Sequence, residues 1–414
     1  MLSKQLTDDF WWVGTLDPDL RIFDIVMNID HGTTYNSYVL KGKNKTVVFE
    51  AAKAPFLEDY LEKVREIVPI EEIDILVVDH SEPDHTGTIE KMLELNPKMQ
   101  IVGTSGALNF LKEITNREFT GTAVKDGDEI DIGGRTLRFI MAPNLHWPDT
   151  MFTWVPEEGL LVTCDVFGAH YSYEGIVNDA SIDDGIWMEM AHFYFDAIIS
   201  PFRADVRTAL KKIEGLDIRL IATGHGPALV NNPRRMIDLY AEWSSEPDSY
   251  EKKTVIIPYV SAYGYTKLLA QEIRQGICDA GDIDVRLCDM VYSDPAEVLC
   301  VIKKADGFLF GTPTILGEAL PPIWDLASRL TAREVAGKYA GAFGAYGWSG
   351  EGVPHLMERL KQLKVKLVGD GLRVRFKPDE AQREEARAFG ELFGRAVLGL
   401  DASGPQGAGQ RNGQ

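Results

Sequence analysis

Residues 73–85 read Ile-Asp-Ile-Leu-Val-Val-Asp-His-Ser-Glu-Pro-Asp-His, an apolar run followed by two histidines and two carboxylates within six positions. Because residues 73–79 are apolar and β-branched, they predict a strand buried on both faces. The carboxyl end of this strand then delivers residues 80–85 into a cleft, where Pro83 stiffens the loop. We expect His80 and Glu82 to converge on one metal ion, while Asp84 and His85 turn toward a second. The alternative is a polar loop that contains two of the eight histidines by chance.

Three later positions can complete a ligand set. His146 follows the apolar stretch 137–141, Asp165 ends the apolar stretch 159–165, and His225 follows residues 218–224 in a Gly-His-Gly turn. Each of these stretches predicts a buried strand. A single histidine after a strand is more often an ordinary loop residue than a ligand. The order of all these positions along one chain favours a shared metal site.

That order resembles the metallo-β-lactamase superfamily, whose αββα sandwich carries its metal ions on loops at one edge of two facing sheets. The zinc hydrolases of that superfamily usually have His-x-His-x-Asp-His, and here Glu82 replaces the second histidine. A set of four imidazoles and three carboxylates is oxygen-rich, which suits iron or manganese better than zinc. Two ferrous ions with a bridging hydroxide would be neutral against Glu82, Asp84 and Asp165, and neutrality lowers the cost of burial.

The sequence His-Ser-Glu-Pro-Asp-His, then His-Trp-Pro-Asp, then a lone aspartate, then Gly-His-Gly is similar to that of the flavodiiron proteins. By position, this resemblance implies one iron on His80, Glu82 and His146. It implies a second iron on Asp84, His85 and His225, with Asp165 as the bridge. Tyr194 falls where the family has a tyrosine that lines the substrate pocket, so it is a candidate catalytic residue. The alternative is a core aromatic on a helix.

The C-terminal half contains a candidate phosphate loop. Residues 254–260 predict a strand, and an apolar-periodic helix is expected from Lys267 to about Ile277. Between them lies the segment Ser261-Ala262-Tyr263-Gly264-Tyr265-Thr266. Small residues and hydroxyls at a helix N-terminus place backbone amides and the helix dipole around a phosphate. The segment resembles the flavodoxin phosphate loop, although Tyr265 stands where a small or polar residue is more usual.

Two more loops fit a flavin mononucleotide (FMN) site, and each follows an apolar strand pattern. The first, after residues 307–310, offers Thr312, Pro313, Thr314 and Ile315, and the second, after residues 339–344, offers Gly347, Trp348, Ser349 and Gly350. The first would turn under the isoalloxazine ring, and Trp348 between glycines is placed to stack on a flat ligand. A single glycine loop is as often structural as functional. Three at the strand ends of an open α/β sheet favour FMN.

The predicted fold is α/β with two domains. A metallo-β-lactamase-like αββα sandwich is expected over residues 1–249, and a flavodoxin-like, doubly wound parallel sheet over residues 250–400. A chain of 414 residues with 45% hydrophobic content can bury two cores, and the polar segment 243–253 is the expected boundary. Residues 401–414, rich in Gly and Gln, predict a disordered tail.

Composition limits the partners and the compartment. Sixty-three acidic against forty-three basic residues give a net charge of -20, which argues against nucleic-acid binding. We find no signal peptide and no apolar run of membrane-spanning length, so a cytoplasmic protein is expected. The four cysteines, Cys164, Cys278, Cys288 and Cys300, have no CxxC spacing. This excludes a fused rubredoxin or iron–sulfur module and predicts reduced core thiols.

The flavodiiron resemblance also implies an activity. It implies FMN and two non-heme iron ions per subunit, which reduce dioxygen to water, nitric oxide to nitrous oxide, or both. The electron donor would be separate: rubredoxin, a deazaflavin or a flavin reductase. The family forms a head-to-tail homodimer, or a dimer of dimers, in which the flavin of one subunit meets the irons of the other.

The preference between the two gases stays open in the sequence. Many oxygen-preferring relatives carry a histidine after an Arg-x-Phe segment, where this chain has Asp24 after Arg21-Ile22-Phe23. His31 is a candidate stand-in, and the alternative for it is a surface-loop histidine.

Two functions of other classes also stay open. One is a dinuclear zinc hydrolase with a flavodoxin-like accessory domain, against which Glu82 argues. The other is an electron-carrier flavoprotein whose N-terminal domain is a metal-free docking module. Metal content separates all three.

Overall fold

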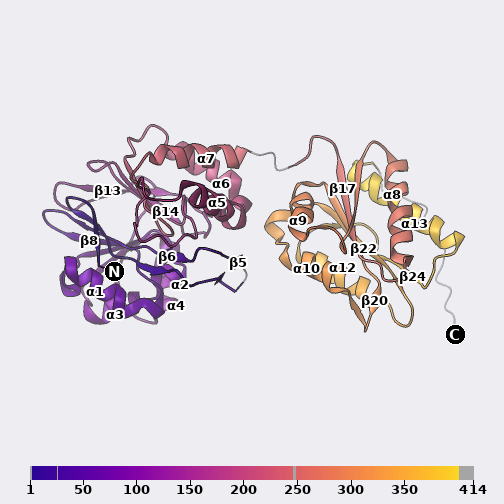
Figure 1. The fold of residues 1–414 in the computed structure, drawn as a ribbon, viewed down its shortest axis with the longest axis horizontal. Coiled ribbons are helices and arrows are strands. Elements are labelled where there is room, and N and C mark those ends of the chain that lie inside the picture. Colours follow the sequence, from indigo (N-terminus) through magenta and orange to yellow (C-terminus); the bar gives the residue numbers. More distant parts are fainter. Residues whose placement is uncertain (1, 26, 246–248, 401–414) are drawn as a thin grey trace. The chain divides into compact units, whose positions relative to one another are not determined.

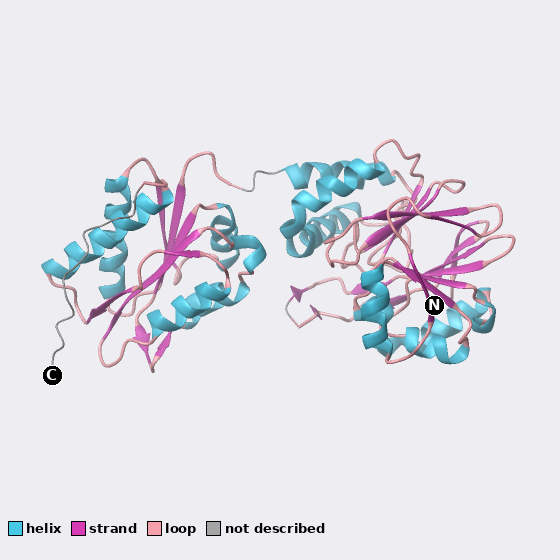
Figure 2. Ribbon diagram, turned by 180° about the vertical axis from the view of Figure 1, so that it is seen from behind, coloured by secondary structure: helices cyan, strands magenta, loops and turns pink. Residues whose placement is uncertain are grey.

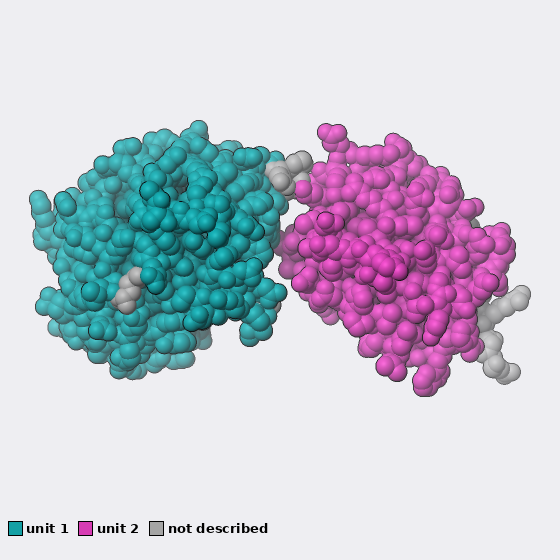
Figure 3. All heavy atoms as spheres, in the orientation of Figure 1, with its two compact units in different colours: residues 1–246 teal, residues 247–414 magenta. Residues whose placement is uncertain are grey.

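The computed structural model describes residues 2–25, 27–245 and 249–400. The chain forms two compact units, Met1–Glu246 and Pro247–Gln414 (Figure 3). The predicted tail, residues 401–414, lies outside the described residues. Residues 243–245, which the sequence assigns to a linker, instead end helix α7 (Pro233–Ser245). The reason is that Trp243 packs against the rings of Phe195 and Tyr240 and so belongs to the core of the first unit.

Two sheets form the centre of the first unit (Figure 1). The first sheet has the order β1 (Lys4–Thr7), β2 (Phe10–Trp12), β7 (Tyr38–Lys41), β8 (Thr46–Phe49), β9 (Ile75–Val78), β10 (Gln100–Gly103) and β11 (Thr120–Ala123). The second has the order β12 (Glu129–Asp131), β13 (Thr136–Met141), β14 (Met151–Val155), β15 (Leu160–Cys164) and β16 (Leu220–Thr223). Two short antiparallel pairs accompany them: β3 (Thr15–Asp17) pairs with β6 (Thr33–Tyr35), and β4 (Ile22–Phe23) pairs with β5 (Met27–Asn28).

Helices cover the outer face of each sheet, as Figure 2 shows. The first sheet packs on α1 (Leu57–Ile67), α3 (Ile89–Leu95) and α4 (Ser105–Thr115). The second packs on α5 (Asp184–Tyr194), α6 (Arg203–Ile213) and α7. A third core lies between the sheets, where Val47 and Val77 of the first share a cluster with Phe139 of the second. Because side chains alternate along a strand, each sheet serves two cores. The predicted αββα sandwich is confirmed.

The strand expected over residues 73–79 is β9, whose four residues are all buried between β8 and β10 in parallel pairing. The loop expected after it is partly helical. Asp84 and His85 lie on the one-turn helix α2 (Pro83–Thr86), with Pro83 at its first position. Proline favours that position because its missing N–H would have no helical acceptor there.

The second unit is a parallel sheet in the order β18 (Asp284–Asp289), β17 (Thr254–Tyr259), β19 (Gly307–Gly311), β22 (Tyr339–Tyr346) and β23 (Lys366–Leu367), with β24 (Leu372–Arg375) also on β22. One face packs on α8 (Tyr265–Ala280) and α13 (Glu380–Val397). The other packs on α9 (Pro295–Lys304), α10 (Pro321–Arg329), α11 (Ala332–Val335) and α12 (Gly352–Gln362). A hairpin, β20 (Thr314–Ile315) with β21 (Glu318–Ala319), follows β19. This strand order is that of flavodoxin, and the predicted doubly wound sheet is confirmed.

The prediction that all four cysteines are core residues is wrong for Cys300, which is exposed on α9, whereas Cys164 is buried. Among the described residues, no helix is long and apolar enough to cross a membrane.

Glycines bring α8 and α13 into close contact. A Cβ at Gly276 would overlap the carbonyl oxygen of Arg387, and one at Gly390 would overlap that of Ile273. The two backbones therefore pack directly on each other, with no side chain between them at these points.

We expect Gly276→Ala to lower the free energy of unfolding of the second unit by about 1–3 kcal/mol, because the added methyl group must push the helices apart. Chemical denaturation of the full chain, followed by circular dichroism, measures this. Arg274→Ala, at an exposed position of the same helix, is the control and should change little. Equal stability of the Gly276 variant and the control would contradict the close packing.

Candidate functional site

Four strand ends bring the seven predicted metal ligands together in the first unit. His80 and Glu82 follow β9, and Asp84 and His85 lie on α2 just beyond them. His146 lies in the turn after β13, Asp165 directly follows β15, and His225 follows β16. The side chains form two neighbouring groups, His80, Glu82, His146 and Asp165 in one and Asp84, His85 and His225 in the other. Within each group the candidate ligand atoms all lie within 4.8 Å of one another.

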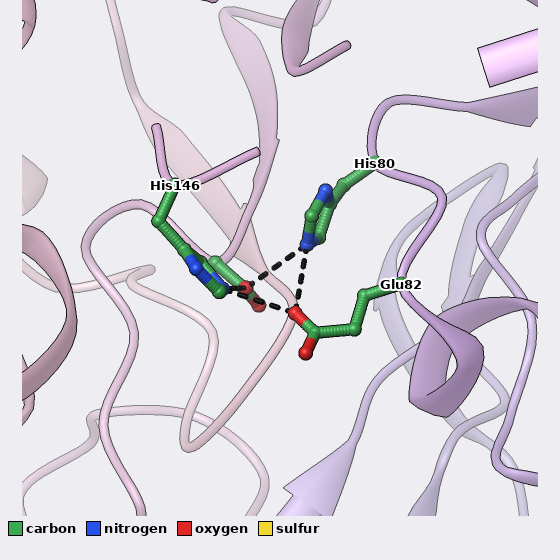
Figure 4. A group of neighbouring side chains, drawn as sticks. His80, Glu82 and His146 are labelled. Carbon is green, nitrogen blue, oxygen red and sulfur yellow. Dashed lines mark hydrogen bonds and ion pairs between the residues drawn. The ribbon is translucent and has the colours of Figure 1, made fainter. Parts of the chain in front are cut away.

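The first group is shown in Figure 4, where the imidazoles of His80 and His146 point toward the carboxylate of Glu82. His80 Nε2 lies 3.1 Å from Glu82 Oε2, and His146 Nε2 lies 3.0 Å from the same oxygen. The two imidazole nitrogens also lie 3.4 and 3.0 Å from Asp165 Oδ2.

The second group uses the other oxygen of Asp165. His85 Nε2 and His225 Nε2 lie 3.0 and 3.4 Å from Asp165 Oδ1. His225 Nε2 is 3.2 Å from Asp84 Oδ2, and its Nδ1 is 2.5 Å from the carbonyl oxygen of Thr34, so the carbonyl accepts the Nδ1 proton. This bond fixes the tautomer that leaves Nε2 free to bind a metal. Asp165 thus divides its two oxygens between the groups, as a carboxylate bridging two metal ions must.

Hydrogen bonds and opposite charges shift the pKa values of these side chains away from their usual values. Burial raises the pKa of Asp165, but the charge of His85 and the hydrogen bond from His146 outweigh it and lower that pKa well below its usual value. Burial lowers the pKa of His146, but hydrogen bonds with Asp165 and Glu82 outweigh it and raise that pKa to about 9. Metal binding to these side chains must therefore displace protons.

The donor set fits two hard metal ions. Asp84 is only 5% exposed, and its Oδ1 has no hydrogen-bond partner among the described residues, while its Oδ2 lies 3.2 Å from His225 Nε2. Buried carboxylate oxygens without donors are costly unless a cation binds them. Three carboxylates beside four imidazoles favour iron or manganese over zinc.

The hydroxyl of Tyr194 has no hydrogen-bond partner among the described residues, and the side chain is fully buried. Its ring centroid lies 6.0 Å from that of His225, so the predicted position beside the metal ligands agrees with the geometry. His170, which sequence reasoning missed, lies between them with ring centroids 4.9 Å from Tyr194 and 5.0 Å from His225. Its Nδ1 is 2.9 Å from Thr33 Oγ1. The only signal for it was its position five residues after Asp165.

The two positions considered for gas preference differ in their surroundings. His31 packs edge-on against Tyr171, with ring centroids 5.8 Å apart, and lies outside both ligand groups. Partial burial and the negative charges of Glu82 and Asp84 raise the pKa of Asp24. Asp24 is therefore electrostatically coupled to the predicted ligands.

The predicted flavin loops meet at a pocket of about 250 Å³ in the second unit, at the carboxyl ends of β17, β19 and β22. Ten of the fourteen predicted residues line it: Ser261, Ala262, Tyr263, Tyr265, Thr266, Pro313, Thr314, Ile315, Gly347 and Trp348. Helix α8 begins at Tyr265, and the first amides of a helix have no helical acceptor, so they can bind a phosphate here. The pocket thus offers both a phosphate site and aromatic walls for a flat ring.

The other four predicted residues do not line the pocket. Gly264 precedes α8 with φ at 83°, a left-handed conformation that favours glycine. Thr312 is buried, and its hydroxyl accepts a hydrogen bond from the amide of Leu320. Ser349 and Gly350 continue the loop that carries Trp348. The pocket also includes Ala345, Tyr346 and Phe376, which were not predicted.

Two family models match this chain, one in each unit. Residues 33–226 match the family model described as "ODP family beta lactamase", and residues 257–390 match the model described as "Flavodoxin". A flavo-diiron protein of Clostridium acetobutylicum, FprA2, is 38% identical over 96% of this chain and 100% of its own length. The chain belongs to the flavodiiron family.

Two other comparisons support the assignment of this chain to the flavodiiron family. A nitric oxide reductase of Moorella thermoacetica is 35% identical over 88% of this chain and 91% of its own. The solved structure of rubredoxin oxygen:oxidoreductase from Desulfovibrio gigas matches with a TM-score of 0.69 and 25% identity, over 96% of this chain and 99% of that one. As a flavodiiron protein, this chain is an oxidoreductase that uses FMN and a non-heme diiron site.

In this flavodiiron protein, two buried acidic side chains accept hydrogen bonds from backbone amides of the loop that carries His80 and Glu82. Glu50 Oε1 accepts hydrogen bonds from the amides of Asp79 and His80, at 2.6 and 3.2 Å. Asp149 Oδ2 accepts one from the amide of Ser81, at 3.0 Å. Three successive amides at the end of β9 are thus held by acids at 1% and 2% exposure, from elements remote in sequence. Sequence reasoning missed the role of both acids: Glu50 lies in no ligand motif, and Asp149 ends the His-Trp-Pro-Asp motif but was not predicted to support the loop.

We expect Glu50→Ala to reduce iron affinity by about ten- to a hundredfold, as losses behind a metal ligand typically do. Two buried amides would lose their acceptor, and the loop that carries His80 and Glu82 would loosen. Iron per chain, measured after dialysis against a graded chelator, tests this.

Glu50→Gln keeps an acceptor oxygen and should retain most of the iron, while Glu62→Ala, at an exposed position of α1, should have no effect. Iron binding as weak in the Gln variant as in the Ala variant would show that the hydrogen bonds are not what holds the loop.

Proposed function

We propose that one iron ion binds His80, Glu82 and His146, that a second binds Asp84, His85 and His225, and that Asp165 bridges them. The division of Asp165 between the two histidine groups is the observation that supports this most, because each oxygen lies within 3.4 Å of two imidazole nitrogens. Glu82, in place of the usual histidine, contributes a charge that favours iron.

The chain would reduce dioxygen to water, nitric oxide to nitrous oxide, or both. The pocket of the second unit would hold FMN and the two ligand groups would hold the iron ions, and together these cofactors would supply the electron transfer that gas reduction needs. The names of two relatives, a rubredoxin oxygen:oxidoreductase and a nitric oxide reductase, support both gases.

The described side chains would exclude bulk water and hold the ligands in place. His80, His85, Asp84 and Asp165 are each at most 5% exposed, whereas the side chains of Glu82 and His146 are 16% and 21% exposed, so most but not all of the ligands are shielded from water. Burial raises the pKa of Tyr194 well above its usual value, so its hydroxyl keeps its proton. We propose that this hydroxyl, which has no partner among the described residues, lines the substrate pocket as a hydrogen-bond donor.

The electron donor would be a separate protein or flavin, and rubredoxin is the first to test because one relative is named for it. A deazaflavin and a flavin reductase are the other candidates. A head-to-tail homodimer, or a dimer of dimers, would bring the flavin of one subunit to the irons of another.

We expect two iron ions and one FMN per chain after anaerobic purification, by elemental analysis and flavin absorbance. Consumption of dioxygen and of nitric oxide, with a chemically reduced donor, should then follow, and the ratio of the two rates gives the preferred gas. Two zinc ions with no gas uptake would reject the proposal in favour of a hydrolase.

We expect Glu82→Ala and His146→Ala to lower gas reduction by more than about a hundredfold, since a ligand should cost at least as much as the groups that support it. Flavin absorbance should stay unchanged, because the flavin pocket lies in the other unit. His192→Ala, an exposed histidine outside both ligand groups, is the control. Full turnover by either ligand variant depleted of metal would rule out the diiron mechanism.

A further inference from the structure

One part of the flavin pocket lining comes from a segment outside the three predicted glycine loops. Phe376 lines it from the loop that follows β24, on the far side of the sheet order from the phosphate loop. Among the described residues that line the pocket, it alone comes from this segment. No glycine or hydroxyl motif surrounds it in the sequence, which reads Arg-Phe-Lys-Pro at positions 375–378.

The backbone at Phe376 is held in an unfavourable conformation. Its φ is 59°, in the left-handed region, which bulky side chains rarely occupy. The amide of Phe376 donates to the carbonyl oxygen of Tyr346 at 2.6 Å, and Arg375 Nε donates to that of Gly347 at 3.2 Å. The β24 loop is therefore tied to the loop that carries Trp348. Strain of this kind persists where the surroundings enforce it, often at ligand sites.

The ring of Phe376 packs directly on Gly347. A Cβ added at Gly347 would lie 2.7 Å from Phe376 Cε1 and 3.1 Å from Cζ. Glycine at position 347 therefore leaves room for the ring, not only for a turn. With 57% of its surface exposed, the side chain is not a core residue. Burial in the protein core therefore does not account for an aromatic side chain on a strained backbone here.

We propose that Phe376 is a positioning residue for the flavin: its ring forms an apolar wall of the pocket and holds the 346–348 loop against the bound isoalloxazine. This rests on the flavin site proposed above and adds a fourth segment to it. A planar aromatic ligand gains from contact with a second ring, and a supported loop loses less freedom when the flavin binds.

The test is the FMN dissociation constant of the full chain after flavin removal, followed by quenching of flavin fluorescence. Phe376→Asn should raise it roughly tenfold, because the aromatic contact is lost. Asparagine tolerates a left-handed backbone, so the loop should keep its conformation. Phe376→Tyr retains the ring and should restore affinity to within about twofold of the wild type.

Leu316→Asn is the matched control. Leu316 also has a left-handed φ, 55°, and a 95% exposed side chain in a neighbouring loop, but it does not line the pocket. Its substitution should leave FMN affinity unchanged. Thermal unfolding of the flavin-free variants checks that they fold.

The ring contact itself can be tested with Gly347→Ala. In the wild-type background the added methyl group meets the Phe376 ring and should weaken FMN binding, whereas in the Phe376→Asn background it should cost much less. Equal losses in both backgrounds would overturn the contact as the reason for the glycine.

The outcomes separate the two proposals. Wild-type chain that does not bind FMN would reject the flavin site and this inference with it. Wild-type binding with an unchanged constant in Phe376→Asn, or an equal loss in Leu316→Asn, would reject only the role of Phe376.

Discussion

The candidate metal site of the first unit depends on the carboxylate of Asp165. Its two oxygens face different pairs of histidines, and these histidines come from both sheets of the sandwich. His80 and His85 follow β9 of the first sheet, while His146 and His225 follow β13 and β16 of the second. The core between the sheets sets the distance between these edges. Side-chain packing remote from the ligands therefore decides whether the two groups meet at one carboxylate.

Much of this arrangement could be predicted, because three of the ligands closely follow short, buried, apolar strands. The strands after which His80, Asp165 and His225 lie have recognisable patterns, and parallel strands bring such ends to one edge. Ten of the residues predicted for the flavin loops line one pocket of the second unit. At these positions the candidate site residues lie next to the strand patterns that can be recognised in the sequence.

Glu50 and Phe376, which were missed, have no local pattern, whereas Asp149 stands in the His-Trp-Pro-Asp motif and only its contact was missed. Glu50 supports the ligand loop across 29 and 30 positions of sequence, and Asp149 does so across 68. Phe376 reaches the flavin pocket only because β24 pairs with β22. A buried acid after a strand and an aromatic in a loop are common in proteins, so only the tertiary structure reveals what they contact. Residues 243–245 of the expected boundary segment are helical for a related reason: Trp243 packs against Phe195 and Tyr240, and the polar residues that surround it in the sequence do not reveal this contact.

The spread of the ligands along the chain sets the order of assembly. They run from His80 to His225, which is most of the first unit, so no shorter N-terminal fragment contains both complete groups. A ribosome-bound chain cannot offer the site until the strand before His225 has joined the second sheet. The site is therefore complete only when both sheets have formed, and metal binding to it is coupled to the folding of the whole unit rather than of one segment.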